Sequence, residues 1–293
     1  MVKLEHFSSL TRNREDLLSK PYCYGSFGVV NIEVDSDNLT FHTRSSLRNE
    51  NEANKVRASS WLKFQLAQAS LKAKKRTDGL SHYTIEWVPK DLIPDLKLKS
   101  ECKVSTSEGS QTAEPSLTAE YSMENLKAKL AFADNPRVVK GSLTTAFGDY
   151  GVGLDGKFDI SSKRLTGYNT AVWWNYKDKE VVLKHLGTNK EKLALGEFQL
   201  SYYYQKDKVT FGSLVSSNWQ NKSTYMELGG DYDYDDITVL SGKINSEGKV
   251  GAALKRKLSP YLTLRVASEV DATKVSSNAI NNYKFGFRFD FNH

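Results

Sequence analysis

Hydrophobic and polar residues alternate with a period of two along most of the chain. The clearest case is residues 284–291, where four phenylalanines alternate with Lys284, Gly286, Arg288 and Asp290. On an extended strand, successive side chains point to opposite faces, so one face of this segment is aromatic and the other is polar. A soluble sandwich would turn the aromatic face toward a core, and a transmembrane barrel would turn it toward lipid.

The same alternation recurs in segments of about ten residues that are separated by polar turns. It is evident in residues 62–66, 126–132, 198–204 and 262–271. At about fourteen residues for a strand with its turn, the roughly 265 residues that remain accommodate about nineteen strands. The sequence therefore predicts one all-β barrel over residues 29–293, without a second domain.

Helical spacing of useful length occurs near the N-terminus, in residues 4–20. Charged residues lie on one side of this predicted helix, and the other side carries an apolar set made up of Leu4, Phe7, Leu10, Leu17 and Leu18. Pro21 ends the helix, and the residues that follow form a linker to the first strand. Residues 1–28 are thus predicted to be an amphipathic helix with a hinge.

Two architectures fit this pattern. Lectins, lipocalins and sandwiches are soluble and common, whereas a membrane barrel has its apolar face outside and its polar face toward the lumen. Aromatic residues near strand ends favour the membrane barrel, because such residues form girdles at membrane interfaces; they are Trp61, Trp87, Trp173, Trp174, Trp219, Tyr225, Tyr232 and Tyr234. No stretch of about eighteen apolar residues is present, so no membrane-spanning helix is predicted.

The lumen predicted for such a barrel is basic. The chain has a formal net charge of +6, and fixed positive charge on a wide wall raises the local concentration of anions. The helix contributes Arg12, Arg14 and Lys20. The cations predicted to face the lumen from the strands are Lys63, Lys72, Lys74, Lys97, Lys99, Lys127, Lys129, Lys243, Lys255, Arg265, Lys284 and Arg288.

Other chemistry has little support in the sequence. The five histidines are scattered, and no phosphate-binding glycine loop, nucleophile elbow or HExxH motif occurs. We therefore expect no catalysis, no metal and no cofactor. Residues 72–76 have the composition of a nucleic-acid patch, but their place between a strand and a turn favours a basic strand end. No specific nucleic-acid partner is expected.

Three segments resemble the family of mitochondrial voltage-dependent anion channels, the eukaryotic porins. Residues 10–28 are similar to its N-terminal helix and hinge, residues 158–177 to its signature, and residues 241–291 to its last three strands. The final strand matches the sorting signal of mitochondrial outer-membrane barrels, carried here by Lys284, Gly286, Phe289 and Phe291. Lys97 matches the lysine of a Gly-Leu-Lys motif whose glycine is replaced in this chain by Asp95.

The resemblance implies a nineteen-stranded barrel in the mitochondrial outer membrane, with the helix inside the lumen. It implies voltage-gated, anion-preferring passage of ATP, ADP, phosphate and other small metabolites, with Arg12, Arg14, Lys20 and Lys97 as anion or nucleotide contacts. Expected partners are membrane lipids, these anions, and the outer-membrane import and assembly machinery; a homo-oligomer or a larger mitochondrial complex stays open. Two alternatives remain: a porin-derived structural subunit of a larger complex, and a protein-import channel of the same superfamily.

Overall fold

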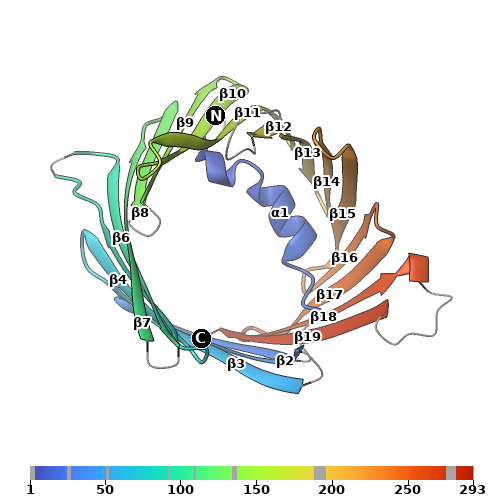
Figure 1. Cartoon of the computed structure of the whole chain (residues 1–293). Helices are drawn as coiled ribbons and strands as arrows, with labels where there is room; N and C mark the ends of the chain where they lie inside the picture. Colours follow the sequence, from blue (N-terminus) through green and yellow to red (C-terminus); the bar gives the residue numbers. More distant parts are fainter. Residues whose placement is uncertain are drawn as a thin grey trace.

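The chain forms one closed barrel with a short helix inside it (Figure 1). The computed structural model describes residues 4–24, 28–50, 53–91, 93–107, 110–133, 137–187, 196–274 and 282–292. Nineteen strands and an N-terminal helix confirm the predicted fold class. Part of the predicted hinge, residues 25–27, lies outside the described residues. Among those described, no helix is long and apolar enough to cross a membrane.

The strands vary from eight to thirteen residues in length, and a 3-10 turn, η2 (Ala272–Lys274), precedes the last one. They are β1 (Gly28–Ser36), β2 (Leu39–Glu50), β3 (Ala53–Gln65), β4 (Ala69–Arg76), β5 (Leu80–Trp87), β6 (Leu96–Ser107), β7 (Ser110–Ser122), β8 (Leu126–Ala133), β9 (Val138–Phe147), β10 (Tyr150–Asp159), β11 (Arg164–Tyr176), β12 (Lys179–Gly187), β13 (Glu197–Lys206), β14 (Val209–Asn218), β15 (Ser223–Asp235), β16 (Thr238–Asn245), β17 (Lys249–Ser259), β18 (Leu262–Asp271) and β19 (Tyr283–Asn292).

Strands that are consecutive in the sequence pair with one another in antiparallel orientation. The barrel closes where β1 runs parallel to β19, with Val29 beside Arg288 and Ile32 beside Phe291. An odd number of strands in an up-and-down order makes this parallel pair necessary, because the first and last strands run in the same direction. Closure pairs both edge strands and leaves no free sheet edge.

The pairing register separates the strand residues into an outer and an inner face. Large hydrophobic side chains such as Leu62, Leu143 and Phe287 are exposed on the outer face, where a membrane barrel contacts lipid. The inner face is identified by its contact with the helix, since the Lys243 Nζ donates a hydrogen bond to the Leu18 carbonyl. All twelve strand cations predicted to face the lumen lie on this inner face.

The prediction that the listed aromatic residues form a girdle on the outer face is wrong for three of them. Trp61, Trp173 and Tyr225 lie on the inner face according to the register. Trp173 is buried with Phe7 in a small core between the N-terminal segment and the wall. Both Trp173 and Trp174 were predicted to belong to the girdle, but neighbours on a strand point to opposite faces and only Trp174 is on the outer face.

The N-terminal segment consists of two short helical pieces, which corrects the expectation of one helix over residues 4–20. A 3-10 turn, η1 (Phe7–Ser9), is followed by α1 (Arg12–Ser19), and Thr11 between them has φ −122° and ψ 16°. The break has a packing cause, because the two pieces contact different strands. Phe7 and its apolar neighbours pack on β9 and β10, whereas α1 packs on β13, β14 and β15.

Candidate conduction pathway

The hinge crosses the inner face of β19 at Gly286. A Cβ atom at this position would overlap the backbone carbonyl of Cys23 and would lie 2.9 Å from the Tyr24 Cα. Because backbone atoms cannot move aside as a flexible side chain does, this close approach requires glycine. The structure thus gives a steric role to a residue that the sequence placed in the sorting signal.

The helix α1 is held against the wall by a buried arginine. Arg14 is 5% exposed, and its Nε donates a hydrogen bond to the Ser201 Oγ at 3.0 Å. Burial lowers the pKa of Arg14, while Glu15, whose carboxylate lies 3.6 Å from the guanidinium, acts in the opposite direction. Arg14 therefore lies between the helix and β13 rather than facing the open lumen, where the sequence prediction placed an anion contact.

Two lysines that hold the N-terminal segment were not recognised as such from the sequence. The Lys184 Nζ donates to the Thr11 Oγ1 at 2.8 Å and lies 5.6 Å from the centre of the Phe7 ring. Thr11 in turn donates to the Glu15 carboxylate at 2.5 Å. Lys184 was not among the cations predicted to face the lumen, and no spacing rule could have linked it to a threonine 173 positions away.

Lys243 contacts the C-terminal end of α1. Its Nζ lies 2.9 Å from the Leu18 carbonyl, 3.3 Å from the Glu227 carboxylate and 4.5 Å from the centre of the Tyr22 ring. The last carbonyls of a helix lack partners within the helix and carry partial negative charge, so a cation here stabilises the end. Burial raises the pKa of Tyr22, which keeps its hydroxyl neutral.

The two predicted cations on the exposed side of α1 share one acid. The Arg12 Nε lies 3.7 Å and the Lys20 Nζ 2.6 Å from the same Asp16 oxygen. The side chain of Arg12 is 67% and that of Lys20 is 61% exposed. Exposed ion pairs of this kind are weak, so both cations remain accessible to anions in the lumen.

Lys97 lies on a different part of the wall, on the inner face of β6. Its Nζ is 3.0 Å from the Glu86 carboxylate of the neighbouring strand. The structure therefore does not bring Lys97 together with the helix cations, which lie over β13, β14 and β15. The four predicted contacts form two separate groups, with Arg14 turned away from the lumen.

The four residues of the predicted sorting signal divide between the two faces of β19. Lys284 and Gly286 are on the inner face, and Phe289 and Phe291 are on the outer face. The Lys284 Nζ lies 3.0 Å from the Glu269 carboxylate on β18. These placements agree with the alternation of the sequence, while recognition by another protein is a separate question.

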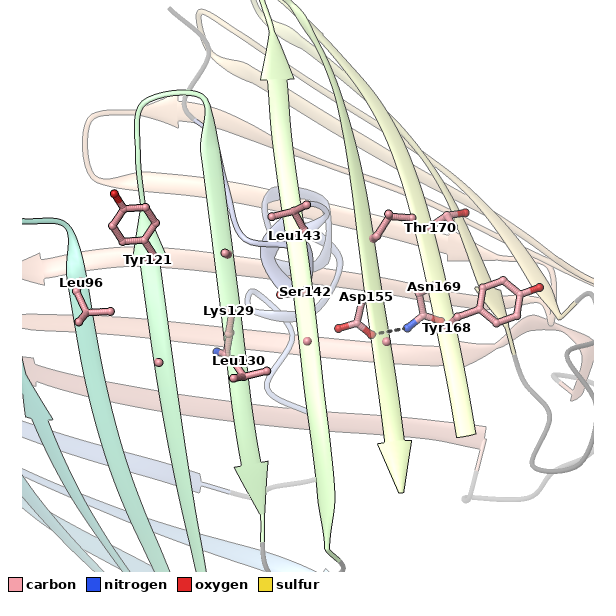
Figure 2. Close-up of a pocket in the computed structure, with 15 residues that line it drawn as sticks. Leu96, Tyr121, Lys129, Leu130, Ser142, Leu143, Asp155, Tyr168, Asn169 and Thr170 are labelled. Carbon is pink, nitrogen blue, oxygen red and sulfur yellow. Dashed lines mark hydrogen bonds between the residues drawn. The ribbon is translucent and has the colours of Figure 1, made fainter. Parts of the chain in front are cut away.

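A shallow apolar hollow of about 590 Å³ lies on the wall formed by β6–β11 (Figure 2). Its side chains include Leu130, Leu143 and Tyr168, which the register places on the outer face. The Asn169 Nδ2 donates to the Asp155 Oδ1 at 2.9 Å on the other face of the same strands. The hollow is therefore part of the lipid-facing surface and separate from the lumen.

A polar cavity of about 730 Å³ lies inside, between the N-terminal segment and β11–β13. Glu5, Asp178 and Glu180 are among its lining residues, and the Asn13 Nδ2 donates to the Glu180 carboxylate at 3.2 Å. Among the residues that the structure describes, no group of three or more histidine, cysteine or acidic side chains is arranged to hold a metal ion. The charged side chains of this cavity line part of the path along the inner wall.

This geometry defines a class, a transmembrane β-barrel with a helix against one side of a charged lumen. A similar barrel fold occurs in a solved mutant of Rh. blastica porin, with a TM-score of 0.51 at 10% identity over 86% of this chain and 97% of that one. At that identity the likeness concerns the fold alone.

The sequence model of the eukaryotic porins matches residues 5–286, so the chain belongs to the eukaryotic porin family. It is 27% identical to the voltage-dependent anion-selective channel of Drosophila melanogaster over 90% of this chain and 92% of that one. It is also 21% identical to the mitochondrial outer membrane protein porin of Candida albicans over 97% of this chain and 98% of that one. The family resemblance drawn from the sequence is confirmed; it is a family of channels rather than enzymes.

Proposed function

We propose that this porin is a voltage-gated, anion-preferring channel of the mitochondrial outer membrane that passes ATP, ADP, phosphate and other small metabolites. The observation that carries the proposal is the basic inner face of the barrel, with lysines and arginines on strands from β3 to β19. Fixed charge on the wall of a wide pore favours hydrated anions without holding them. Full-length relatives named as a voltage-dependent anion-selective channel and a mitochondrial porin support it.

The N-terminal segment is the gating element in this proposal. Its apolar side contacts the wall, and its exposed side places Arg12 and Lys20 in the lumen. A charge that moves across the full membrane potential gains about 2.3 kcal/mol per 100 mV. Displacement of α1 together with its charges would therefore couple the pore to voltage and would change the charge presented to the solute.

The anion contacts are proposed to be Arg12, Lys20 and Lys97, each near one acid and each accessible. Arg14 instead positions the helix, because its guanidinium is buried against Ser201. For assembly, we propose that Lys284, Gly286, Phe289 and Phe291 are recognised by the outer-membrane import and assembly machinery, and that the outer face then contacts lipid.

Single-channel recording tests this function. The full chain is refolded into a planar bilayer, and its conductance and reversal potential are measured in a salt gradient over a range of voltages. We expect a large conductance, a reversal potential of the sign that indicates anion preference, and partial closure at high voltage. A barrel that inserts without conducting would favour the structural-subunit alternative, and cation preference would favour the import-channel alternative. Either result contradicts the proposal.

A further inference from the structure

The inner face of β2–β4 is cationic, and its lysines lack the acidic partners that Lys97, Lys129, Lys243 and Lys284 have elsewhere on the wall. Among the side chains that the structure describes on this face, none is acidic, and the cations and aromatic residues are His42, Arg44, Arg57, Trp61, Lys63, Lys72, Lys74 and Arg76. The basic stretch at residues 72–76, noted in the sequence as a strand end, contributes three of them. Its cations therefore face the lumen, apart from Lys75, whose position in the register is outward.

The pairing register places like charges directly opposite each other here. Lys63 on β3 lies directly opposite Lys72 on β4. Lys74 is the next inward-facing residue of β4. Other inward cations also lie opposite one another, as Arg265 does opposite Arg288, but Arg265 and Arg288 both contact the Asp290 carboxylate. On β7 and β8 a lysine faces an acid directly, as Lys129 faces Glu120 at 2.7 Å. Like charges directly opposite on paired strands are destabilising. An anion from the lumen would remove that cost.

Aromatic rings fix the position of the central lysine. The Lys72 Nζ lies 4.1 Å from the centre of the Trp61 ring, and the ring of His42 stacks on Trp61 at 5.2 Å with an interplanar angle of 14°. A cation over an indole face is attracted by the ring quadrupole. This contact holds the ammonium near Lys63 and Lys74 without neutralising it, as a carboxylate would do. None of the ion pairs found among the described residues involves these three lysines.

We propose that Lys63, Lys72 and Lys74, supported by Trp61 and His42, form a binding site for a polyphosphate group in the lumen. Three ammonium groups on adjacent positions match several phosphate oxygens at once, and lysine binds phosphate as a point charge. The site lies on β3 and β4, away from the strands that carry the helix (Figure 1). The site rests on the proposed function and deepens it, because it adds a nucleotide contact on the wall to those proposed on the helix.

The test compares two variants with the same change in net charge. Lys72→Gln removes the central ammonium of the site, and Lys129→Gln removes a lysine that already has an acidic partner. Tripolyphosphate is added to the refolded full chain in a planar bilayer, and the concentration that halves the chloride current is measured. We expect about a fivefold increase in that concentration for Lys72→Gln, on the scale of one ion pair at a half-exposed site, and little change for Lys129→Gln. Equal shifts in both variants would overturn the proposal.

A second readout does not depend on conduction. Tryptophan fluorescence of the full chain in lipid nanodiscs is titrated with tripolyphosphate, ATP and sulfate, and Trp61→Phe identifies the part of the signal that arises at the site. Saturation by tripolyphosphate and ATP well below the sulfate concentration supports the site, and tighter binding of ATP shows that the nucleoside contributes. Equal binding of sulfate contradicts it, as does a Trp61→Phe titration identical to wild type.

The two proposals fail in different ways. If wild type prefers cations but tripolyphosphate still titrates Trp61 and this is lost in Lys72→Gln, the channel proposal fails and the site stands. If wild type is an anion-preferring channel but Lys72→Gln and Lys63→Gln both behave as Lys129→Gln does, the site is wrong and the channel proposal stands.

Discussion

The wall beneath the helix and the wall formed by β2–β4 differ in how their charges are balanced. Beneath the helix, acids and cations occur together, and Lys243 contacts both Glu227 and the end of α1. On β2–β4, lysines face one another, and the described inward side chains include no acid. Cations with fixed partners hold the helix in place, whereas Lys63, Lys72 and Lys74, which form none of the ion pairs found among the described residues, are available to mobile anions. The comparison separates the wall cations that fix the helix from the wall lysines that can contact solutes.

Filling the space that Gly286 leaves for the hinge should have the largest effect of the changes considered, and the effect should fall on the helix side of the lumen. Gly286→Val would place a branched side chain against the Cys23 carbonyl, and overpacking costs about 1–3 kcal/mol. We expect the refolded barrel to form with its N-terminal segment detached, so that limited proteolysis cuts near residues 20–24. Gly242→Val is the matched control, because a Cβ there meets no atom within 4 Å. Equal protease resistance of Gly286→Val and wild type would contradict the close approach.

Loss of the cation at the end of α1 should have a smaller effect in the same direction. Lys243→Met keeps much of the side-chain length but removes the charge near the Leu18 carbonyl, which we expect to weaken helix docking by about 1–2 kcal/mol. Amide hydrogen exchange of residues 15–19 in nanodiscs measures this as faster exchange. Glu227→Gln should change it less, since the carbonyl contact remains. Exchange rates that stay at the wild-type value in Lys243→Met would refute the role of this lysine.

Replacing one cation by glutamine on each side of the lumen should distinguish an effect on the docking of α1 from an effect on ion selectivity. Lys74→Gln should lower the ratio of anion to cation permeability by roughly 1.5-fold, as expected for one partly screened charge beside the path. Arg14→Gln should leave that ratio nearly unchanged but loosen the helix, because its charge is buried against Ser201. Reversal potentials in a salt gradient give the ratio. A larger selectivity change in Arg14→Gln than in Lys74→Gln would reverse the comparison.

Lowering the pH should weaken the contact of the N-terminal segment with the barrel wall. This is the smallest of the expected effects. Burial lowers the pKa of His6 below its ordinary value of 6.5, and its Nδ1 is buried without a hydrogen-bond partner. The folded state then binds the proton less well than the undocked state, so docking is fully stable above about pH 6.5 and weakens as the pH falls through that value. Proteolysis at pH 5 and pH 7.5 measures this, and His6→Gln should remove the difference. An unchanged pH dependence in His6→Gln would assign it to another group.

The faces of the strands were predictable because the barrel obeys a period of two without exception over long stretches. The inward position of all twelve predicted cations follows from that rule alone. The strand number and closure also follow from segment spacing and from the family resemblance. Local periodicity cannot predict which residues of the N-terminal segment contact which strands.

The sequence missed features that depend on contacts between residues distant in the chain. Trp173 was assigned to a membrane girdle, but it packs with Phe7 on the inner side of the wall. Arg14 was grouped with Arg12 and Lys20 by charge, yet its burial against Ser201 depends on the docking of α1. The role of Gly286 depends on a hinge residue far away in the chain, and the sequence showed only its place in a terminal motif.

The central claim is that the lysines of the β2–β4 wall contribute more to anion preference than lysines that have acidic partners, while the helix side gates the pore. The most direct measurement is the reversal potential in a salt gradient of a variant in which Lys63, Lys72 and Lys74 are all replaced by glutamine, recorded beside a variant with Lys129, Lys249 and Lys284 replaced in the same way. We predict that the first variant loses most of its anion preference and still closes at high voltage, while the second keeps most of both. Equal selectivity of the two variants would contradict the account.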